Sequence, residues 1–460
     1  MTPDRRKRRL ARLPGGAAWI CALVLSGVPA VAAAAGGGGE EGNGDSTVVV
    51  VALIGAVATA YLLTHFVVER LQRAFLVMTG IEYIVLGVLL GPEVPLDIPA
   101  FSNLDNLLPI VALAVGWVGL LRGMELSVRR MRGHTPTGAS RVVVSQAVVA
   151  GGLTCAAAYL TFAEGWFFPV GTPATAHVVG TREIWMAAGV MGCAAAAGSV
   201  DPIELLKRRY RLEGDLAERI RRMAAMSDLL AILVFGILFC IFHKEYRDAV
   251  IQPSATEWAV VSVALGALLG VLFTPFLGDD DSENGRFLTM VGIIVLASGA
   301  AYFLDLSPLL VNLCLGAVLV NTAKTGPQIR STLERTKRPM ALVLLVFAGA
   351  LARPVDPVDA TLIAVGYIAL RLVGKAVGTS LAGWRSPLRG DYYRGLIAHG
   401  EVSVAMAVSL RLVYEGPAID LAYTAILASV IVNDLLAPRV LRGLLVDTGD
   451  LRGERKEEPA

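Results

Sequence analysis

The chain has 460 residues, of which 55% are hydrophobic and 17% are charged, and its mean hydropathy is +0.62. Soluble proteins carry about a quarter charged residues, so this composition excludes an ordinary globular fold and requires that apolar surface be buried in a membrane. The net charge of +2 comes from 41 basic and 39 acidic residues and gives no indication of nucleic-acid binding. The five cysteines lack the spacing of metal ligands or of a disulfide scaffold, and we expect them to pack as small apolar residues.

The first residues have the features of a targeting segment. Six basic residues precede an apolar stretch, 17–28, which is followed by a proline and small residues typical of a cleavage site. We therefore expect residues 1–35 to be a signal peptide, with an uncleaved first helix as the alternative. Residues 36–46 then form an extracytoplasmic N-terminus.

Thirteen apolar stretches follow, and most have a length close to the roughly 20 residues that a membrane-spanning helix needs. In chain order they are 47–68, 75–90, 107–121, 142–162, 184–206, 223–242, 258–276, 287–303, 307–320, 340–351, 360–381, 396–413 and 419–436. The ninth and tenth are short enough to be re-entrant. The sequence thus predicts an all-α polytopic membrane protein with a transmembrane domain over 47–436 and a cytoplasmic tail over 437–460.

Positive charge is distributed unevenly among the loops between these spans. With the N-terminus outside, most Lys and Arg residues fall in loops on the cytoplasmic side. The loops expected outside hold four, which are Arg182, Lys244, Arg247 and Arg353. Because cytoplasmic loops of membrane proteins are enriched in Lys and Arg, this asymmetry predicts a multi-pass protein of the cell (inner) membrane with its C-terminus in the cytoplasm.

Asp228 is the strongest functional candidate among the ionisable residues inside the predicted spans. A charge at the bilayer centre costs about 2.5 to 3.5 kcal/mol on insertion scales, so such residues are candidates by default. Asp228 lies near the start of the sixth span, with mostly apolar residues on every helical face around it. A carboxylate in this setting can exchange protons near neutral pH, and a dehydrated monovalent cation beside it would compete with the proton. That competition is the chemistry of a proton-coupled exchanger.

Two of the predicted spans are interrupted. The fifth breaks at 198–202 (GSVDP), because proline removes a backbone donor and clashes with the preceding turn. Asp201 then begins a second half-helix, and we expect this carboxylate and the unwound carbonyls to face Asp228. The twelfth span has a similar break at 399–403 (HGEVS). If the seventh span links two six-span halves, the breaks occupy corresponding positions, which is typical of inverted-repeat transporters with interrupted helices crossing at the midplane.

Basic side chains accompany these breaks. Arg371 and Lys375 lie one helical turn apart on one face of the eleventh span. We expect them to neutralise carboxylates and carbonyl ends where the interrupted helices cross. His399, two residues from Glu401, is either a pH-sensitive member of the site or a hydrogen-bonded structural histidine.

Motifs at these positions resemble the monovalent cation/proton antiporter superfamily, the sodium/proton and potassium/proton exchangers of the 13-span type. The ends of the second and third spans match it at 79–92 and 119–126, and the ninth span matches it at 306–319. The diagnostic pairs are Asp201-Pro202, Ser227-Asp228, Gly374-Lys375 and Gly400-Glu401. The resemblance covers essentially the whole chain after the leader.

The resemblance implies an elevator-like exchanger, usually a homodimer, that needs no cofactor besides the transported Na⁺ or K⁺ and H⁺. A core domain made of spans 142–242 and 360–436 would slide against a dimerisation domain made of spans 47–121 and 287–351. The span 258–276 would link them.

The resemblance also implies the roles of individual residues. Asp228 would bind the cation and the proton alternately, with Asp201 as the second carboxylate ligand of Na⁺ or K⁺. The other implied residues are Ser227, Ser199 and Val200 as ion ligands and Lys375, Arg371 and Glu401 as charge-compensating groups.

Two residues depart from the family pattern. Val200 supplies no hydroxyl where the family commonly has Thr, so coordination would use its carbonyl or Ser199. Ser227 stands where Asn or Asp is common, and without a second acid there we expect electroneutral, one-for-one exchange of Na⁺ for H⁺. The alternatives are a K⁺/H⁺ antiporter of the same fold and, less favoured, a channel or a non-transporting membrane sensor. A membrane enzyme is disfavoured because no HExxH or GxSxG motif occurs.

Overall fold

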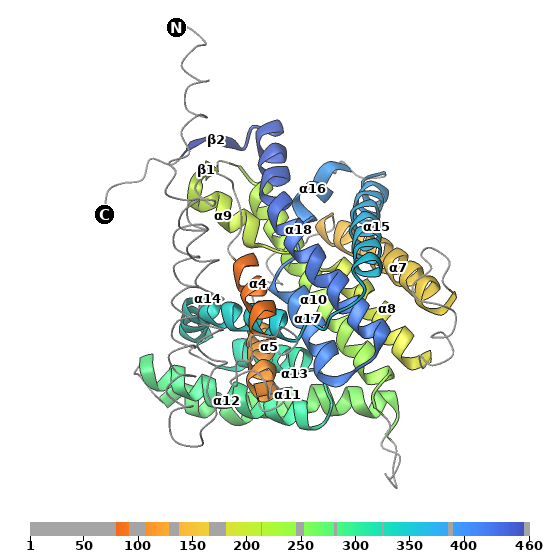
Figure 1. Cartoon of the computed structure of the whole chain (residues 1–460). Coiled ribbons are helices and arrows are strands. Elements are labelled where there is room, and N and C mark those ends of the chain that lie inside the picture. The colour runs from red at the N-terminus through yellow and green to blue at the C-terminus, as the bar shows by residue number, and fades with distance from the viewer. Residues whose placement is uncertain are drawn as a thin grey trace, which may run out of the picture.

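The computed structural model describes residues 80–91, 107–127, 138–164, 181–212, 214–244, 253–279, 283–323, 326–384 and 390–454, which are almost entirely helical (Figure 1). The helices are α4 (Ile81–Leu90), α5 (Leu108–Gly123), α7 (Ala139–Glu164), α8 (Thr181–Ala196), α9 (Asp201–Arg209), α10 (Leu216–Ile241), α11 (Ala255–Asp279), α12 (Glu283–Phe303), α13 (Pro308–Thr322), α14 (Gly326–Ala350), α15 (Pro357–Gly383), α16 (Tyr393–Leu396), α17 (Glu401–Val413) and α18 (Pro417–Asp447). The expected signal peptide 1–35, the N-terminus 36–46 and the first span 47–68 lie outside the described residues.

Six of the described helices, counting α8 and α9 as one interrupted unit, are long and apolar enough to cross a membrane. Three shorter apolar helices fall on the third, eighth and ninth predicted spans. The prediction of an all-α polytopic membrane protein is therefore confirmed, whereas the number of thirteen spans stays a prediction. The tenth span, 340–351, is the apolar end of the 25-residue helix α14, so its short apolar stretch does not mean a short helix.

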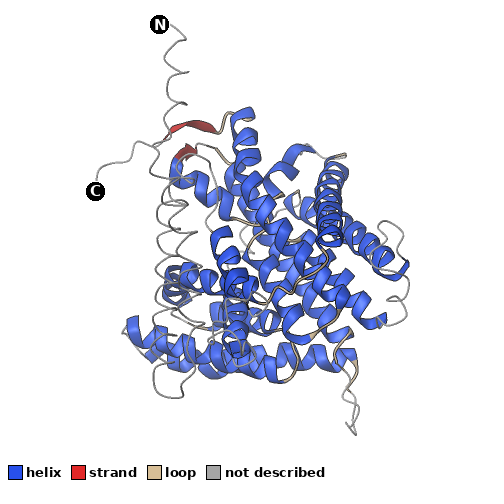
Figure 2. Cartoon of the chain, viewed as in Figure 1, coloured by secondary structure: helices blue, strands red, loops and turns tan. Residues whose placement is uncertain are grey.

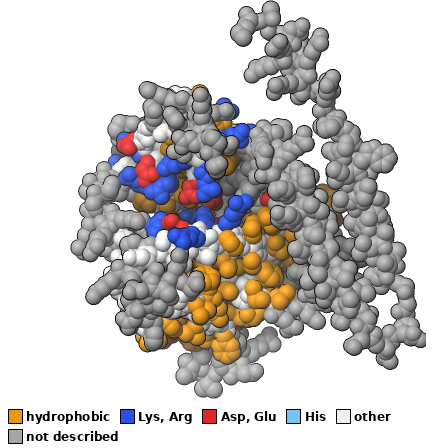
Figure 3. All heavy atoms as spheres, turned by 90° about the vertical axis from the view of Figure 1, so that its left-hand side faces the viewer, with side chains coloured by type: hydrophobic (Ala, Val, Ile, Leu, Met, Phe, Trp, Pro, Cys, Tyr) orange, Lys and Arg blue, Asp and Glu red, His pale blue; other side chains and the backbone are white. Residues whose placement is uncertain are grey.

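Large apolar side chains on the outer surface fit a bilayer environment. Phe303 is 83% exposed and Leu288 is 72% exposed, and both lie on α12. Figure 3 shows a broad hydrophobic surface that borders a band of charged side chains. An apolar surface of this extent is unfavourable in water but favourable against lipid chains. Helices also suit a bilayer because their backbone polar groups are hydrogen-bonded within the helix.

The described helices pack into two groups. The first helix group comprises α7, α8, α9, α10, α15, α16, α17 and α18, and the second comprises α4, α5, α11, α12, α13 and α14. Helices of each group pack mainly on one another, while α5 and α14 also contact α17 of the first group. A separate apolar core lies in the second group, around Trp117, Met290 and Leu315.

Two interrupted helices meet in the first group, as the sequence predicted. α8 ends at Ala196 and α9 begins at Asp201, while α16 ends at Leu396 and α17 begins at Glu401. The two non-helical segments touch, since a Cβ at Gly400 would lie 2.8 Å from Ser199 Oγ. The absence of a side chain at Gly400 therefore allows the two breaks to cross in contact.

A short antiparallel ribbon joins the end of α9 to the C-terminal segment. β1 (Tyr210–Leu212) pairs with β2 (Leu451–Glu454) at one end of the helical bundle (Figure 2). The expected tail 437–460 accordingly begins within α18, which continues to Asp447. The ribbon connects the half-helix that starts at Asp201 to the end of the last helix.

Glycines on α5 and α13 allow these two helices of the second group to pack closely. A Cβ at Gly119 would overlap the carbonyl oxygen of Leu309, and a Cβ at Gly316 would lie 2.5 Å from the Leu120 carbonyl oxygen. Small residues at such crossings let helix backbones approach closely, which is how helices associate in membranes. This contact supports the end of α5, where Arg122 lies.

We predict that Gly119→Ala destabilises the protein, because the new methyl group must push α5 away from the α13 backbone. Overpacking of this kind costs about 1–3 kcal/mol. Gly292→Ala on α12 is the matched control, since a Cβ there meets no atom of the described residues within 4 Å. Thermal unfolding in detergent should show a lower midpoint for Gly119→Ala alone. Equal midpoints for the two variants would contradict the packing argument.

Candidate functional site

Asp228 lies on α10 at the break between α8 and α9, and its side chain is fully buried. Its Oδ1 accepts a hydrogen bond from the backbone N–H of Gly198 at 3.0 Å. Gly198 belongs to the non-helical segment after α8, so its N–H is free to turn toward a side chain. The break thus supplies a backbone donor to the buried carboxylate.

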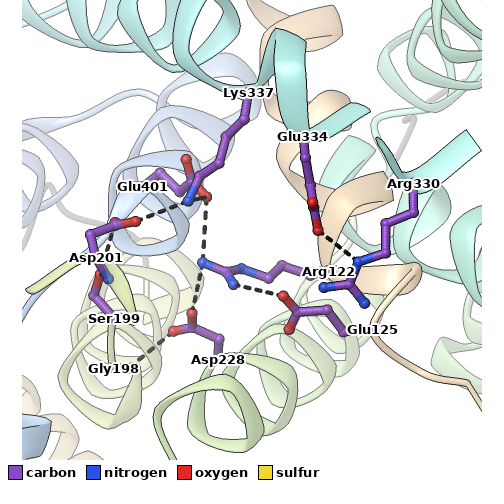
Figure 4. A network of polar contacts seen from close by, with 10 residues as sticks. All are labelled: Arg122, Glu125, Gly198, Ser199, Asp201, Asp228, Arg330, Glu334, Lys337 and Glu401. Atoms are coloured by element: carbon purple, nitrogen blue, oxygen red, sulfur yellow. Dashed lines mark hydrogen bonds and ion pairs between the residues drawn. The ribbon is translucent and has the colours of Figure 1, made fainter. Parts of the chain in front are cut away.

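Arg122, from the last turn of α5, brings a positive charge to the same carboxylate (Figure 4). Its Nη2 lies 3.2 Å from Asp228 Oδ2 and 3.4 Å from Glu401 Oε1. Its Nη1 lies 3.3 Å from Glu125 Oε1. The guanidinium is only 3% exposed, so these charges interact in an environment with little screening by water.

Lys337 on α14 provides a second positive charge, which contacts the same oxygen of Glu401 as Arg122 does (Figure 4). Its Nζ lies 2.9 Å from Asp201 Oδ1 and 3.4 Å from Glu401 Oε1. Asp201 also accepts a hydrogen bond from Ser199 Oγ at 2.9 Å, and the Asp201 N–H donates to the same hydroxyl at 3.2 Å. Lys337 and Ser199 together hold this carboxylate at the start of α9.

These side chains form one alternating network of charges, which we call the charged cluster. Its members are Arg122, Glu125, Asp201, Asp228, Lys337 and Glu401. Each carboxylate has a cationic partner, which offsets part of the cost of removing the charges from water. Asp201, Asp228 and Glu401 belong to the first helix group, whereas both cations belong to the second.

Ser227 is fully buried beside Asp228, and its hydroxyl is engaged by other partners. Its Oγ donates to the Met223 carbonyl at 2.9 Å and accepts from Gln146 Nε2 at 2.9 Å. Gln146 Nε2 also donates to the Ala196 carbonyl at 3.2 Å, at the end of α8. Ser227 therefore links α10 to the end of α8 through Gln146, a residue that sequence reasoning missed.

Val200, the other expected ligand at this break, is buried and precedes α9. Its carbonyl oxygen accepts from the N–H groups of Ile203 at 3.1 Å and Glu204 at 3.2 Å. The carbonyl therefore belongs to the first turn of α9. Ser199 is the residue of this pair whose side chain reaches a carboxylate, that of Asp201.

Arg371 and Lys375 bind the carbonyl ends of the interrupted helices. Lys375 Nζ donates to the carbonyls of Ala197 at 2.7 Å and Leu396 at 2.8 Å. Arg371 donates to the carbonyls of Ala197, Ile397 and Ala398. Among the described residues, neither side chain forms an ion pair with Asp201, Asp228 or Glu401.

Both basic side chains thus complement the negative C-terminal ends of α8 and α16, where backbone carbonyls have no intrahelical partner. Direct pairing with the carboxylates is made by Arg122 and Lys337, which sequence reasoning did not include in the site. Arg122 ends an apolar span, which was an available signal. Lys337 gave no signal, because it precedes the tenth span and resembles an ordinary cytoplasmic loop charge.

His399 lies in the second break and is fully buried. Its Nδ1 is 2.7 Å from Ser403 Oγ, and its ring stacks against Tyr367 with centroids 6.1 Å apart. These contacts favour the structural alternative for this histidine over a role beside Glu401.

Comparisons with known proteins agree with this architecture. A family model described as "Sodium/hydrogen exchanger, transmembrane" matches residues 57–443. A structure of the sodium proton antiporter MjNhaP1 from Methanocaldococcus jannaschii at pH 8 has a TM-score of 0.55 and 16% identity, and the match covers 85% of this chain and 99% of that one. An electron-microscopy structure of the same antiporter has a TM-score of 0.54 and 16% identity, covering 89% and 99%. At this identity the likeness concerns the fold. No curated protein matches the chain by sequence.

We predict that Lys375→Met lowers stability, because the carbonyls of Ala197 and Leu396 lose a buried charged donor. Leaving such groups unpaired costs about 1–3 kcal/mol. Lys207→Met is the matched control: Lys207 is 41% exposed and pairs with Glu218 at 3.4 Å, a contact worth less than about 1 kcal/mol. Thermal unfolding should show a clearly larger decrease for Lys375→Met. If the midpoint of Lys375→Met falls no further than that of Lys207→Met, Lys375 does not stabilise the protein through these carbonyls.

Proposed function

Because the chain belongs to the sodium/hydrogen exchanger family, we propose that it exchanges Na⁺ for protons and that Asp228 binds the two ions in turn. As a member of this family it is a multi-pass membrane transporter of cations and protons rather than an enzyme. It needs no cofactor, and the transported ions are its substrates. Our proposal concerns which cation is transported, which residues bind it and how the protein moves it across the membrane.

The observation that carries the proposal is the setting of Asp228. Its carboxylate is fully buried between the Gly198 amide and the Arg122 guanidinium. A buried carboxylate is costly unless a proton, a cation or a charged side chain offsets it. If a proton and a cation compete for this one group, the movement of one is coupled to the movement of the other.

Oxygen ligands for a dehydrated cation gather at the same crossing. Asp201 and Ser199 lie at the first break and Glu401 begins the half-helix after the second. Transporters commonly bind Na⁺ where discontinuous helices meet near the centre of the fold. We assign Asp228 and Asp201 as carboxylate ligands, with Ser199 as a neutral oxygen ligand. Ser227 and the Val200 carbonyl remain candidates that would have to exchange their present partners.

The two helix groups support an elevator-type mechanism. In our proposal the first helix group, which carries Asp201, Asp228 and Glu401, is the moving core. The second group, which carries Arg122 and Lys337, is the stationary scaffold through which two copies form a homodimer. The distribution of Lys and Arg among the loops favours the inner membrane with the C-terminus in the cytoplasm.

We predict that Asp228→Asn abolishes cation-driven proton movement, because an amide does not take up and release a proton near neutral pH and has no negative charge for which a proton and a cation could compete. Inside-out vesicles containing a pH-sensitive dye would be acidified and then given Na⁺, Li⁺ or K⁺. Asp215→Asn, at the residue that precedes the same helix, is the matched control, since Asp215 is 81% exposed. Wild type and the control should respond to Na⁺, whereas Asp228→Asn should stay at background. A normal response of Asp228→Asn would exclude its role, and a response to K⁺ alone would make K⁺ the substrate.

We also predict electroneutral exchange, because Asp228 is the single acidic residue of the sixth predicted span. Purified protein in proteoliposomes should exchange Na⁺ for H⁺ at the same rate whether or not a membrane potential is imposed with K⁺ and valinomycin. Each turnover then moves one positive charge in each direction, so the potential does no work on the cycle. Na⁺ flux that is driven by the potential would exclude one-for-one stoichiometry.

A further inference from the structure

We propose that Arg122 is a built-in competitor of the transported cation, and that its guanidinium must leave Asp228 before this carboxylate can bind the cation. The inference rests on the proposed function and adds a residue that sets the apparent cation affinity.

Arg122 reaches the site from the second helix group, whereas its two central partners belong to the first. One nitrogen of its guanidinium, Nη2, contacts both carboxylates. It lies 3.2 Å from Asp228 Oδ2 and 3.4 Å from Glu401 Oε1. A cation that used either oxygen would have to approach this guanidinium. Because like charges in a poorly screened site repel strongly, the cation and the guanidinium cannot share the carboxylates at full strength.

The contacts of Arg122 are suited to exchange rather than to permanent locking. Charge-assisted hydrogen bonds between nitrogen and carboxylate are typically about 2.7–2.9 Å long. The separation to Asp228 is 3.2 Å, and Asp228 Oδ2 is a buried oxygen without a properly aligned hydrogen bond. Arg122 Nε is likewise buried and has no hydrogen-bond partner among the described residues. Arg122 donates long hydrogen bonds to Glu125 and Glu401, whereas its contact with Asp228 is an ion pair without an aligned hydrogen bond.

Glu125 gives Arg122 a partner that does not depend on the first helix group. It follows Arg122 by three residues, just beyond the end of α5, and its Oε1 lies 3.3 Å from Arg122 Nη1. When a cation displaces the guanidinium from Asp228, the pair with Glu125 can persist. The released charge is then not left unpaired, which would otherwise be a large part of the cost.

Lys337 repeats this arrangement at the other carboxylates. It also comes from the second helix group, and it pairs with Asp201 at 2.9 Å and with Glu401 at 3.4 Å. Its side chain is 26% exposed, so solvent weakens its hold compared with that of Arg122. The two cations connect the helix groups in this conformation through the same carboxylates that we assign to the transported ion. Loading of a cation would therefore remove these ionic links between the groups and leave their helix packing.

The test compares cation binding and transport in wild type and Arg122→Gln. Purified protein at alkaline pH would be titrated with NaCl against choline chloride, and thermal stabilisation would report the apparent Kd. Vesicle assays would give the KM for Na⁺. We expect Arg122→Gln to lower both constants about tenfold, since coupling energies of close charge pairs are commonly of this size or larger.

Three further variants separate competition by charge from a structural role. Arg122→Lys keeps the charge and should stay near the wild-type constants. Lys337→Gln should lower them by a smaller factor, and it preserves the test if Arg122→Gln does not fold. Arg330→Gln on α14 is the matched control, because Arg330 pairs only with Glu334 among the charged groups described around it and should leave both constants unchanged.

The outcomes distinguish this inference from the proposed function. If wild type exchanges Na⁺ for H⁺ while Arg122→Gln binds Na⁺ no more tightly, the inference fails and the proposed function stands. If wild type does not exchange but Arg122→Gln binds Na⁺ more tightly than wild type, the proposed function fails and the competition stands. The inference also fails if Arg122→Lys behaves like Arg122→Gln or if neither protein binds any of Na⁺, Li⁺ and K⁺.

Discussion

A buried carboxylate must have its charge offset, and this constraint organises the centre of the molecule. Asp228 is fully removed from solvent, so a backbone amide from Gly198 and the guanidinium of Arg122 complete its surroundings. Both partners depend on features elsewhere: Gly198 on the interruption after α8, and Arg122 on the close packing of α5 against α13. The buried charge of Asp228 therefore depends on the interruption between α8 and α9 and on the second helix group, which carries Arg122.

The crossing of the interrupted helices separates two electrostatic tasks. Backbone carbonyls at the ends of α8 and α16 are neutralised by Arg371 and Lys375, whose hydrogen bonds fix the two breaks relative to each other. Carboxylates at the same crossing are neutralised by Arg122 and Lys337 from the other helix group. The first pair stabilises the framework within one group. The second pair acts between the groups, where a change in ion occupancy can alter how they are held together.

Predictions from local sequence succeeded where the cause is local. Proline after Asp201 removes a backbone donor, so the break of the fifth span followed from steric chemistry within a few residues. Long apolar runs gave the helices, since a bilayer leaves few other ways to satisfy the backbone. The tenth span shows the limit of this reasoning, because its apolar stretch is only the end of α14 and its polar start carries Lys337 into the site.

By itself, the sequence determined that the protein is a polytopic membrane protein, that two of its helices are interrupted, and that Asp228 is a carboxylate in apolar surroundings. Each of these depends on composition or on residues close together in the chain. Only the tertiary structure decided which charges meet. The contact between Arg122 and Glu401 joins residues 279 positions apart, and no local pattern encodes such a pairing. In a low-dielectric interior the energy of a charge depends on its nearest partners, so the composition of the site had to come from packing.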